Sequence, residues 1–345
     1  MSNEFTPIID KLKICYTLAE NSYLNILRDN PTEEFEHPEW GYRLRQVQGT
    51  HFNYIYEIVY LDYKDNTFQE FTEQVFGTLQ WGLKADTDEA MQSFVWLQVE
   101  NKQFYLKHDW QHSRLLHLEY IEDTLGLVFN NFTHWDIAID SSCNYPKKLI
   151  QLIRNKEYTP IVNGTKITDR KQLIEDILYI GVGNLDRIKE YSVLVAQKNK
   201  NISLNAYNKK REIESKSHKQ YILDNNDNPK KLYRLEVRIN SDVLKDFFTR
   251  EQITYSPKIF LDKDSLLFFF ITFLNRVLRF QDKNGRTLFR NVIKKNKRQS
   301  LSKNILGLYV ICSLVKKSLR TSLFILTSKR YSFLGLLLLS KMYCL

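Results

Sequence analysis

Three segments of this chain alternate polar and apolar side chains with a period of two, and this pattern most narrows what the chain can fold into. Successive side chains of a strand point to opposite faces, so each segment predicts a strand with one apolar and one polar face. The segments are Trp135 to Asp140, Ile202 to Tyr207 and Tyr233 to Ile239. If they pair in one sheet, their polar side chains gather on one face.

The polar faces of these segments carry acids, arginines and a phenol. The residues concerned are Asp136, Asp140, Tyr207, Arg234, Glu236 and Arg238. Tyr207 also opens the run Tyr207-Asn208-Lys209-Lys210-Arg211-Glu212, which places basic side chains next to the phenol. This combination predicts a nucleophilic tyrosine that acts on phosphate.

A tyrosine nucleophile requires other groups in its site that favour the phenolate. A phenol has an ordinary pKa of about 10, so at neutral pH it needs a metal, or a neighbouring base and cation, to react as a phenolate. Lys209 and Arg211 are the candidates for that positive charge. The carboxylates of Asp136, Asp140 and Glu236 are hard oxygen ligands of the kind that Mg²⁺ or Mn²⁺ prefers, and such a metal would polarise the scissile phosphate.

Each of these residues also has a plain structural interpretation. A tyrosine at the end of a strand is more often packed than reactive, and acids on a half-buried strand often face solvent. Arginine and glutamate on one strand face also form cross-strand charge pairs that contribute little. The histidines show neither a His-x-His pair nor the spacing of a zinc site, so a histidine-based metal centre is not predicted.

The net charge of +10 is unevenly distributed along the 345 residues. After Asp282 there are 14 lysines and arginines and no acid, so residues 1–282 hold 36 basic against 40 acidic side chains. Within that body, residues 186–238 hold 13 basic and 7 acidic groups, which makes the tyrosine region a basic island. Basic groups bind nucleic-acid phosphates regardless of sequence, although a solvated charged surface explains such a run equally well. The predicted DNA contacts are Lys209, Lys210, Arg211, Arg234 and Arg238.

The remaining patterns predict an α+β chain, with an antiparallel sheet and helices packed on one face. Strands are expected at 53–61, 75–81 and 93–99, and helices at 5–27, 146–155, 170–178, 242–250 and 265–280. This divides the chain into an N-terminal helix and linker at 1–40, a central domain at 41–282 that contains the predicted tyrosine site, and a basic tail at 283–345 whose folding stays open. The apolar runs of that tail are each too short to span a bilayer.

Composition excludes several classes of protein. Four cysteines without metal-ligand spacing, and an N-terminus that does not resemble a signal peptide, predict a cytoplasmic protein. The 11 glycines form no phosphate-binding loop, so nucleotide hydrolysis through a P-loop is not supported.

Three stretches together resemble the replication initiation factor family of rolling-circle plasmids and mobile elements. They are Thr133-His134-Trp135-Asp136-Ile137-Ala138-Ile139-Asp140, Ala206-Tyr207-Asn208-Lys209-Lys210-Arg211-Glu212 and Tyr233-Arg234-Leu235-Glu236-Val237-Arg238. The similarity runs from about residue 74 to residue 239, and the order of the motifs is more specific than any one of them. His134 departs from the family, which commonly has arginine at that position.

The resemblance implies an enzyme that nicks and joins DNA through a tyrosine nucleophile and a divalent cation. Tyr207 matches the tyrosine of the family's Tyr-x-Lys-x-x-Glu motif, and Tyr191 and Tyr221 are alternative nucleophiles. The implied substrate is double-stranded origin DNA with a single-stranded or hairpin nick site. The implied partners are a host helicase and a polymerase. A homodimer is also an expectation, since a second chain would supply a second tyrosine to an initiator that must nick twice.

Three other functions fit the same residues. A relaxase-like transfer protein of a mobile element would share the chemistry and differ in its partners. A non-catalytic DNA-binding protein of replication or copy control would keep the basic island without needing Tyr207 or a metal. A degenerate, inactive copy is the third.

Overall fold

The main feature of the fold is an eleven-stranded sheet in which every described strand pair is antiparallel. The computed structural model describes residues 7–37, 40–63, 71–84, 92–105, 110–169, 178–180, 192–196, 201–257 and 263–285. The chain divides into two units, Met1–Lys294 and Lys295–Leu345, and all described residues belong to the first.

The strands of the large sheet follow one another across it in an order that differs from the sequence. That order is β10 (Leu178–Ile180), β11 (Val193–Ala196), β12 (Ile202–Asn208), β13 (Tyr233–Asn240), β7 (Leu127–Ser141), β1 (Ile8–Leu18), β6 (Phe94–Val99), β5 (Phe71–Leu83), β4 (Phe52–Tyr63), β3 (Tyr42–Gln46) and β2 (Glu34–Glu36). A small second sheet has the order β14 (Leu278–Gln281), β8 (Thr159–Val162), β9 (Thr165–Lys166). Together with the helices, this confirms the predicted α+β class with an antiparallel sheet.

The three alternating segments are neighbouring strands, as the sequence predicted. They lie in β12, β13 and β7, with Tyr207 opposite Arg234 and Arg234 opposite Asp140. Glu236 lies opposite Ala138, and Arg238 lies opposite Asp136. Because paired residues of adjacent strands share a face, the acids, the arginines and the phenol lie on one face of the sheet.

The N-terminal segment corrects the sequence-based prediction. Instead of a helix over 5–27, residues 8–18 form β1 in the middle of the sheet, between β7 and β6, and helix α1 covers only Tyr23–Asp29. The register of β1 against β7 shifts between Ile9 and Lys11. This irregularity separates the buried Ile9 and Leu12 by three residues, a spacing that reads as helical in the sequence.

Other helices and strands lie where the sequence placed them. Helices α4 (Tyr145–Arg154), α8 (Ser241–Glu251) and α9 (Lys263–Val277) match the predictions at 146–155, 242–250 and 265–280, although the last ends in β14. Strands β4 and β5 contain the segments predicted at 53–61 and 75–81, and β6 covers the segment predicted at 93–99 except for its first residue. The helix predicted at 170–178 lies almost wholly outside the described residues, and so does nearly all of the basic tail.

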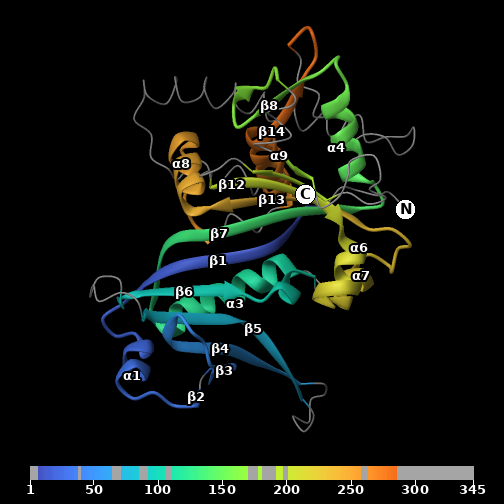
Figure 1. Ribbon diagram of the computed structural model, residues 1–345. Helices are drawn as coiled ribbons and strands as arrows, with labels where there is room; N and C mark the ends of the chain where they lie inside the picture. The colour runs from blue at the N-terminus through green and yellow to red at the C-terminus, as the bar shows by residue number, and fades with distance from the viewer. Residues whose placement is uncertain are drawn as a thin grey trace, which may run out of the picture. The chain divides into compact units, whose positions relative to one another are not determined.

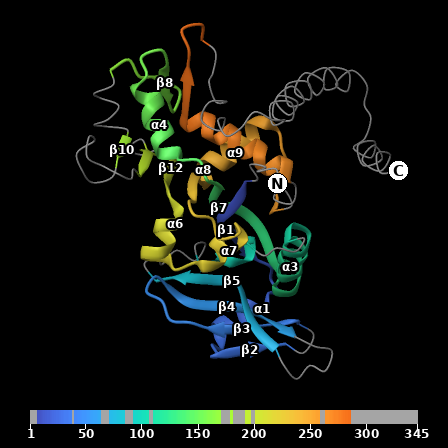
Figure 2. The same cartoon turned by 90° about the vertical axis from the view of Figure 1, so that its right-hand side faces the viewer.

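The helices lie on both sides of the site-bearing strands, which corrects the prediction that they pack on one face (Figures 1 and 2). Helices α4, α8 and α9 lie together on one side of β12 and β13, and α6 (Lys209–Glu212) and α7 (Gln220–Asn225) lie on the other (Figures 1 and 2). On the first side the rings of Trp135 and Phe269 stand 5.3 Å apart, so the apolar strand face and α9 form one core. The short helix η1 (Asn101–Tyr105) joins the second side through side-chain hydrogen bonds to β1 and β13.

Helix α3 (Trp110–Leu125), which the sequence did not predict, packs against β1 and β7. Its Leu118, Ile121 and Leu125 are buried, and the Tyr16 hydroxyl of β1 donates to Glu122 Oε1 at 2.9 Å. Since Tyr16 and Lys13 lie on opposite faces of β1, α3 covers the face away from Lys13. None of the described helices is long and apolar enough to cross a membrane.

Candidate phosphoryl-transfer site

A fully buried arginine organises the polar face. Arg234 has 0% of its surface exposed, and its Nε and Nη2 donate to the two carboxylate oxygens of Asp140 at 2.7 and 2.6 Å. Nη2 also bonds to the Tyr105 hydroxyl at 2.6 Å, and Nη1 pairs with Asp10. Burial alone would lower the pKa of Arg234, but Asp140, Tyr105 and Asp10 outweigh it and raise that pKa. A buried ion is tolerated only with such partners, so this guanidinium ties β13, β7, β1 and η1 together.

Asp10 is a member of the site that the sequence analysis missed. It lies at the irregularity of β1, where its Oδ1 accepts hydrogen bonds from Tyr105 Oη at 2.8 Å and from Asn101 Nδ2 at 3.1 Å. Burial would raise the pKa of Asp10, but Arg234 and Lys209 outweigh it and hold that pKa well below its usual value. The only sequence signal for Asp10 is that it is a single acid within an apolar stretch, and the spacing of that stretch predicts a helix.

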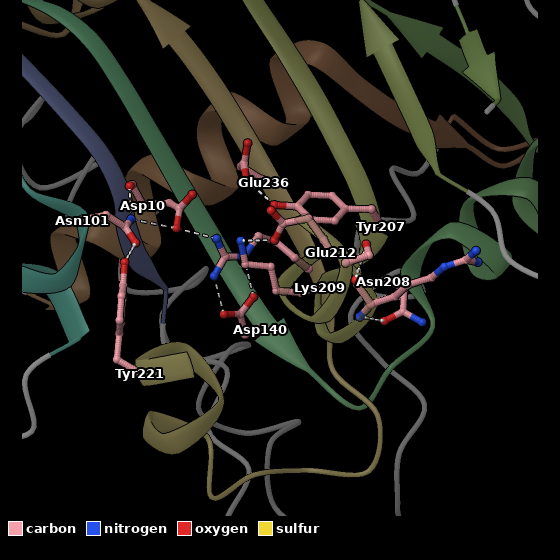
Figure 3. Close-up of polar contacts among 12 residues, drawn as sticks. Asp10, Asn101, Asp140, Tyr207, Asn208, Lys209, Glu212, Tyr221 and Glu236 are labelled. Atoms are coloured by element: carbon pink, nitrogen blue, oxygen red, sulfur yellow. Dashed lines mark hydrogen bonds and ion pairs between the residues drawn. The ribbon is translucent and has the colours of Figure 1, made fainter. Parts of the chain in front are cut away.

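The phenol of Tyr207 and the carboxylate of Glu236 face each other beside this network (Figure 3). The Tyr207 hydroxyl donates to Glu236 Oε2 at 3.1 Å. Burial raises the pKa of the Tyr207 phenol well above its usual value, opposed by Arg234 and reinforced by Glu236. Glu236 is only 1% exposed, and burial raises its pKa as well, with Arg238 opposing the rise. Since Tyr207 stays protonated at neutral pH, any reaction of its oxygen needs a base, and Glu236 is in hydrogen-bonding reach.

Two cations stand beside this pair. Arg238 has a side chain that is 44% exposed, and its Nε contacts Glu236 Oε1 at 2.5 Å and Asp136 Oδ2 at 3.9 Å. Lys209 is buried, with its Nζ 5.7 Å from the centre of the Tyr207 ring and 2.8 Å from Glu212 Oε2. Lys209 therefore contributes positive charge behind the ring, and Arg238 contributes it at the surface.

The basic run after Tyr207 follows from local structure. Asn208 ends the strand and caps α6, since its side-chain oxygen accepts from the Arg211 backbone N–H at 3.0 Å. This turn directs Lys209 inward while Arg211 is exposed. Lys210 turns toward the Pro229 carbonyl at 3.3 Å and Glu214 at 3.5 Å.

Not every predicted site residue fits its predicted role. The DNA contacts predicted for Arg234 and Lys209 do not fit their positions, because a buried side chain held by carboxylates cannot reach a phosphate on the surface. The alternative nucleophile Tyr221 donates its hydroxyl to Asn101 Oδ1 at 2.7 Å, away from Glu236. Tyr191, the other alternative, lies outside the described residues.

The predicted metal ligands do not form one ligand set in this arrangement. Both oxygens of Asp140 are taken by Arg234, whereas Asp136 and Glu236 converge on Arg238. Across the described ranges, no three side chains of histidine, cysteine, aspartate or glutamate are grouped so as to hold a metal ion. His134, the residue that departs from the family pattern, pairs with Asp136 through Nε2 at 2.8 Å and with Asn240 through Nδ1 at 3.0 Å. The residues present therefore do not fit a three-carboxylate metal centre.

Comparison with known proteins identifies no family for this chain. No family model and no curated protein matches the sequence. Among solved structures, a rolling circle replication initiator protein from Geobacillus stearothermophilus is 12% identical, covers 88% of this chain and 95% of its own, and superposes with a TM-score of 0.39. Methanococcus jannaschii TBP is 6% identical, covers 72% and 96%, and has a TM-score of 0.22. Neither likeness is close enough to indicate a function for this chain.

Proposed function

We propose that this protein nicks and rejoins DNA by transferring a phosphoryl group to Tyr207, as the initiator of rolling-circle replication. The observation that carries the proposal is the 3.1 Å hydrogen bond from the Tyr207 hydroxyl to the buried Glu236 carboxylate. A nucleophile bonded to a base, with cations beside it, is the arrangement that activates a hydroxyl for attack.

In the proposed reaction the Tyr207 oxygen attacks phosphorus in line with the bond to the 3′-oxygen. The new bond joins Tyr207 to the 5′-phosphate, the phosphorus–O3′ bond breaks, and the phenol proton passes to Glu236. The departing 3′-oxygen takes a proton from solvent and becomes the 3′-OH that primes a polymerase. Rejoining reverses these steps, with the protonated Glu236 returning its proton to the Tyr207 oxygen.

The raised pKa of Glu236 suits both directions. A carboxyl that titrates closer to neutral pH than usual is a stronger base toward the phenol and remains able to return the proton. Arg238 is positioned to leave Glu236 and bind a nonbridging phosphate oxygen, because its guanidinium is partly exposed beside the pair. Charge-assisted contacts of this kind stabilise the negative charge of phosphoryl transfer.

The biological role is proposed from the sequence motifs. The substrate is origin DNA whose nick site is single-stranded or extruded as a hairpin, and a host helicase and polymerase are the proposed partners. A homodimer that nicks twice remains a prediction that accompanies this role. Dependence on Mg²⁺ or Mn²⁺ also remains a prediction, although Asp136, Asp140 and Glu236 do not form one ligand set for the metal.

The test is a nicking assay on a supercoiled plasmid that carries the DNA flanking this reading frame. Wild-type protein is compared with Tyr207→Phe, with Tyr191→Phe and Tyr221→Phe as matched controls, each with Mn²⁺ and with EDTA. The expected result is nicking with protein bound covalently to the 5′ end, abolished only in Tyr207→Phe. A covalent product that survives Tyr207→Phe and disappears in Tyr191→Phe or Tyr221→Phe would move the nucleophile. Binding without any nicking would favour a non-catalytic DNA-binding protein.

A further inference from the structure

A second surface lies on the same sheet face as Tyr207, beyond the buried network. It comprises Lys11, Lys13, Phe52, Phe94 and Trp96, here called the lysine–aromatic patch, and all five side chains are partly exposed. Their strands are β1, β4 and β6, which lie on the far side of β7 from Tyr207 (Figure 1).

The strand register makes the face continuous between the two regions. Asp136 shares its face with Asp140, and it pairs with Lys11 of β1. Lys13 pairs with His134 on one side and with Gln98 of β6 on the other, two residues along β6 from Trp96. Three strand steps of ~4.8 Å separate β12 from β1, and Lys11 pairs with Asp136, four residues or about 13 Å along β7 from Asp140, so the patch begins roughly 20 Å from Tyr207.

The aromatic rings of the patch are clustered. The rings of Phe52 and Trp96 are 5.3 Å apart, and those of Phe94 and Trp96 are 6.3 Å apart. On the opposite face of β6, Val95, Leu97 and Val99 are buried, so the core takes the apolar side of this strand and leaves Phe94 and Trp96 outside it. The rings of Phe94 and Trp96 therefore do not fill the core and remain available to a ligand.

The positive charges of the patch have few local partners. Lys13 Nζ lies 5.8 Å from the centre of the Phe52 ring and 3.4 Å from Gln80 Oε1. Within the described part of the chain, neither Lys11 nor Lys13 forms an ion pair, and the neighbouring Asp136 is engaged by His134 and Arg238. Partial burial and the nearby charge of Lys11 lower the pKa of Lys13, as expected for cations held together without an anion.

Rings and unpaired lysines on an open sheet match the chemistry of unpaired nucleotides. Unstacked bases bind aromatic side chains through their faces, and lysines bind the phosphates between them. The bases of a duplex are already stacked, and protein interfaces are poor in lysine, so double-stranded DNA and a protein partner fit less well.

We propose that the lysine–aromatic patch binds single-stranded DNA and holds the unpaired strand that leads to Tyr207, an inference that rests on the proposed function. Bases stack on Trp96 and Phe52, and Lys11 and Lys13 contact the adjacent phosphates. The sheet face thereby combines a reaction site at β12–β13 with a strand-holding surface at β1–β6.

The test measures the affinity of the full-length protein for a labelled oligothymidylate by fluorescence anisotropy, with duplex DNA and single-stranded RNA of matched length beside it. Trp96→Leu removes the ring and keeps an apolar side chain, and Lys11→Gln/Lys13→Gln removes two charges. The control, Lys147→Gln/Lys148→Gln, removes the same charge from α4 on the other side of the sheet. Circular dichroism and thermal melting verify that each variant is folded.

Trp96→Leu is expected to weaken single-strand binding about tenfold, within the range for one base–aromatic stack. The Lys11/Lys13 variant is expected to reduce the slope of log affinity against log salt by about 1.4, from about 0.7 per phosphate contact. The α4 control is expected to change neither the single-strand affinity nor the slope against salt. Single-strand binding that is equal in wild type and both patch variants overturns the inference, and so does a preference for duplex DNA or RNA.

The same variants separate this inference from the proposed function. Tyr207→Phe is expected to lose nicking and to keep single-strand affinity. Single-strand binding that depends on Trp96, in a wild-type protein that never nicks, would support the patch and overturn the proposed nicking activity. Nicking that depends on Tyr207, with no effect of the patch variants on single-strand binding, would support the proposed nicking activity and overturn the role of the patch.

Discussion

The network around Arg234 and the lysine–aromatic patch lie on the same sheet face, but their charged side chains differ in burial and pairing. Around Arg234 the charged groups are buried and paired with one another, whereas in the lysine–aromatic patch the cations are partly exposed and stand beside rings. Buried charges are costly to leave unpaired and so fix geometry, while exposed charges contribute little to stability and remain available to a ligand. The comparison indicates that the first region holds Tyr207 in place and the second is suited to binding.

The largest effect is expected at the base of the reaction site. Glu236→Gln should reduce nicking by about 10²- to 10⁴-fold, the usual contribution of a general base. Because burial raises the pKa of Glu236, the ionised carboxylate costs stability at neutral pH, so the glutamine variant should remain folded. Single-turnover nicking rates against pH provide the measurement. Wild-type activity should rise with pH through a carboxyl pKa above the usual 4.5, and a profile that keeps this limb in the variant would contradict the assignment.

Removal of Arg234 should show that the buried region is structural. Arg234→Leu leaves Asp10 and Asp140 buried without their cation, and the expected loss in free energy of unfolding is about 3–5 kcal/mol. Urea denaturation measures it, with Arg238→Leu as the comparison. Arg238 is 44% exposed, and the pKa of its partner Glu236 is already raised, so that carboxyl can take up a proton when its cation is removed. The loss for Arg238→Leu is therefore expected to be smaller, at about 1 kcal/mol. Equal losses in the two variants would remove the distinction between the regions.

Acid should weaken the buried network through Asp10. The folded pKa of Asp10 lies below its ordinary value of 3.8, so its contribution to stability is present above that value and is lost as pH falls toward the folded pKa. At neutral pH, Asp10→Asn is expected to cost about 1–3 kcal/mol, because it weakens a charged hydrogen bond to Arg234. The difference between wild type and variant should shrink below about pH 4, as followed by urea denaturation at several pH values. A difference that is constant from pH 7 to pH 3 would argue against a lowered pKa.

The smallest effect on stability is expected in the lysine–aromatic patch. Lys11→Gln/Lys13→Gln removes two charges that lack ion pairs in the described structure, so the free energy of unfolding should change by no more than about 0.5 kcal/mol. Thermal melting at low and high salt measures the change. A loss comparable to that of Arg234→Leu would mean that these lysines are structural.

Much of the candidate site was predictable from local patterns. The alternation in Tyr233 to Ile239 predicted that Arg234, Glu236 and Arg238 share one face. The structure confirms this in β13, which pairs with β12 on one side and β7 on the other. The prediction for the N-terminal segment was wrong because the irregularity at Asp10 breaks the period of two, and a shifted strand then resembles a helix.

What the sequence by itself determined is therefore the three site-bearing strands and their polar face, because these depend on short-range periodicity. Only the tertiary structure decided that β1 enters the middle of the sheet and brings Asp10 to Arg234. It also decided that Arg234 and Lys209 are buried and Arg238 is partly exposed, although all three are basic residues near one motif. Burial and pairing between distant segments depend on how the whole chain packs, and the order of residues near a motif does not encode them.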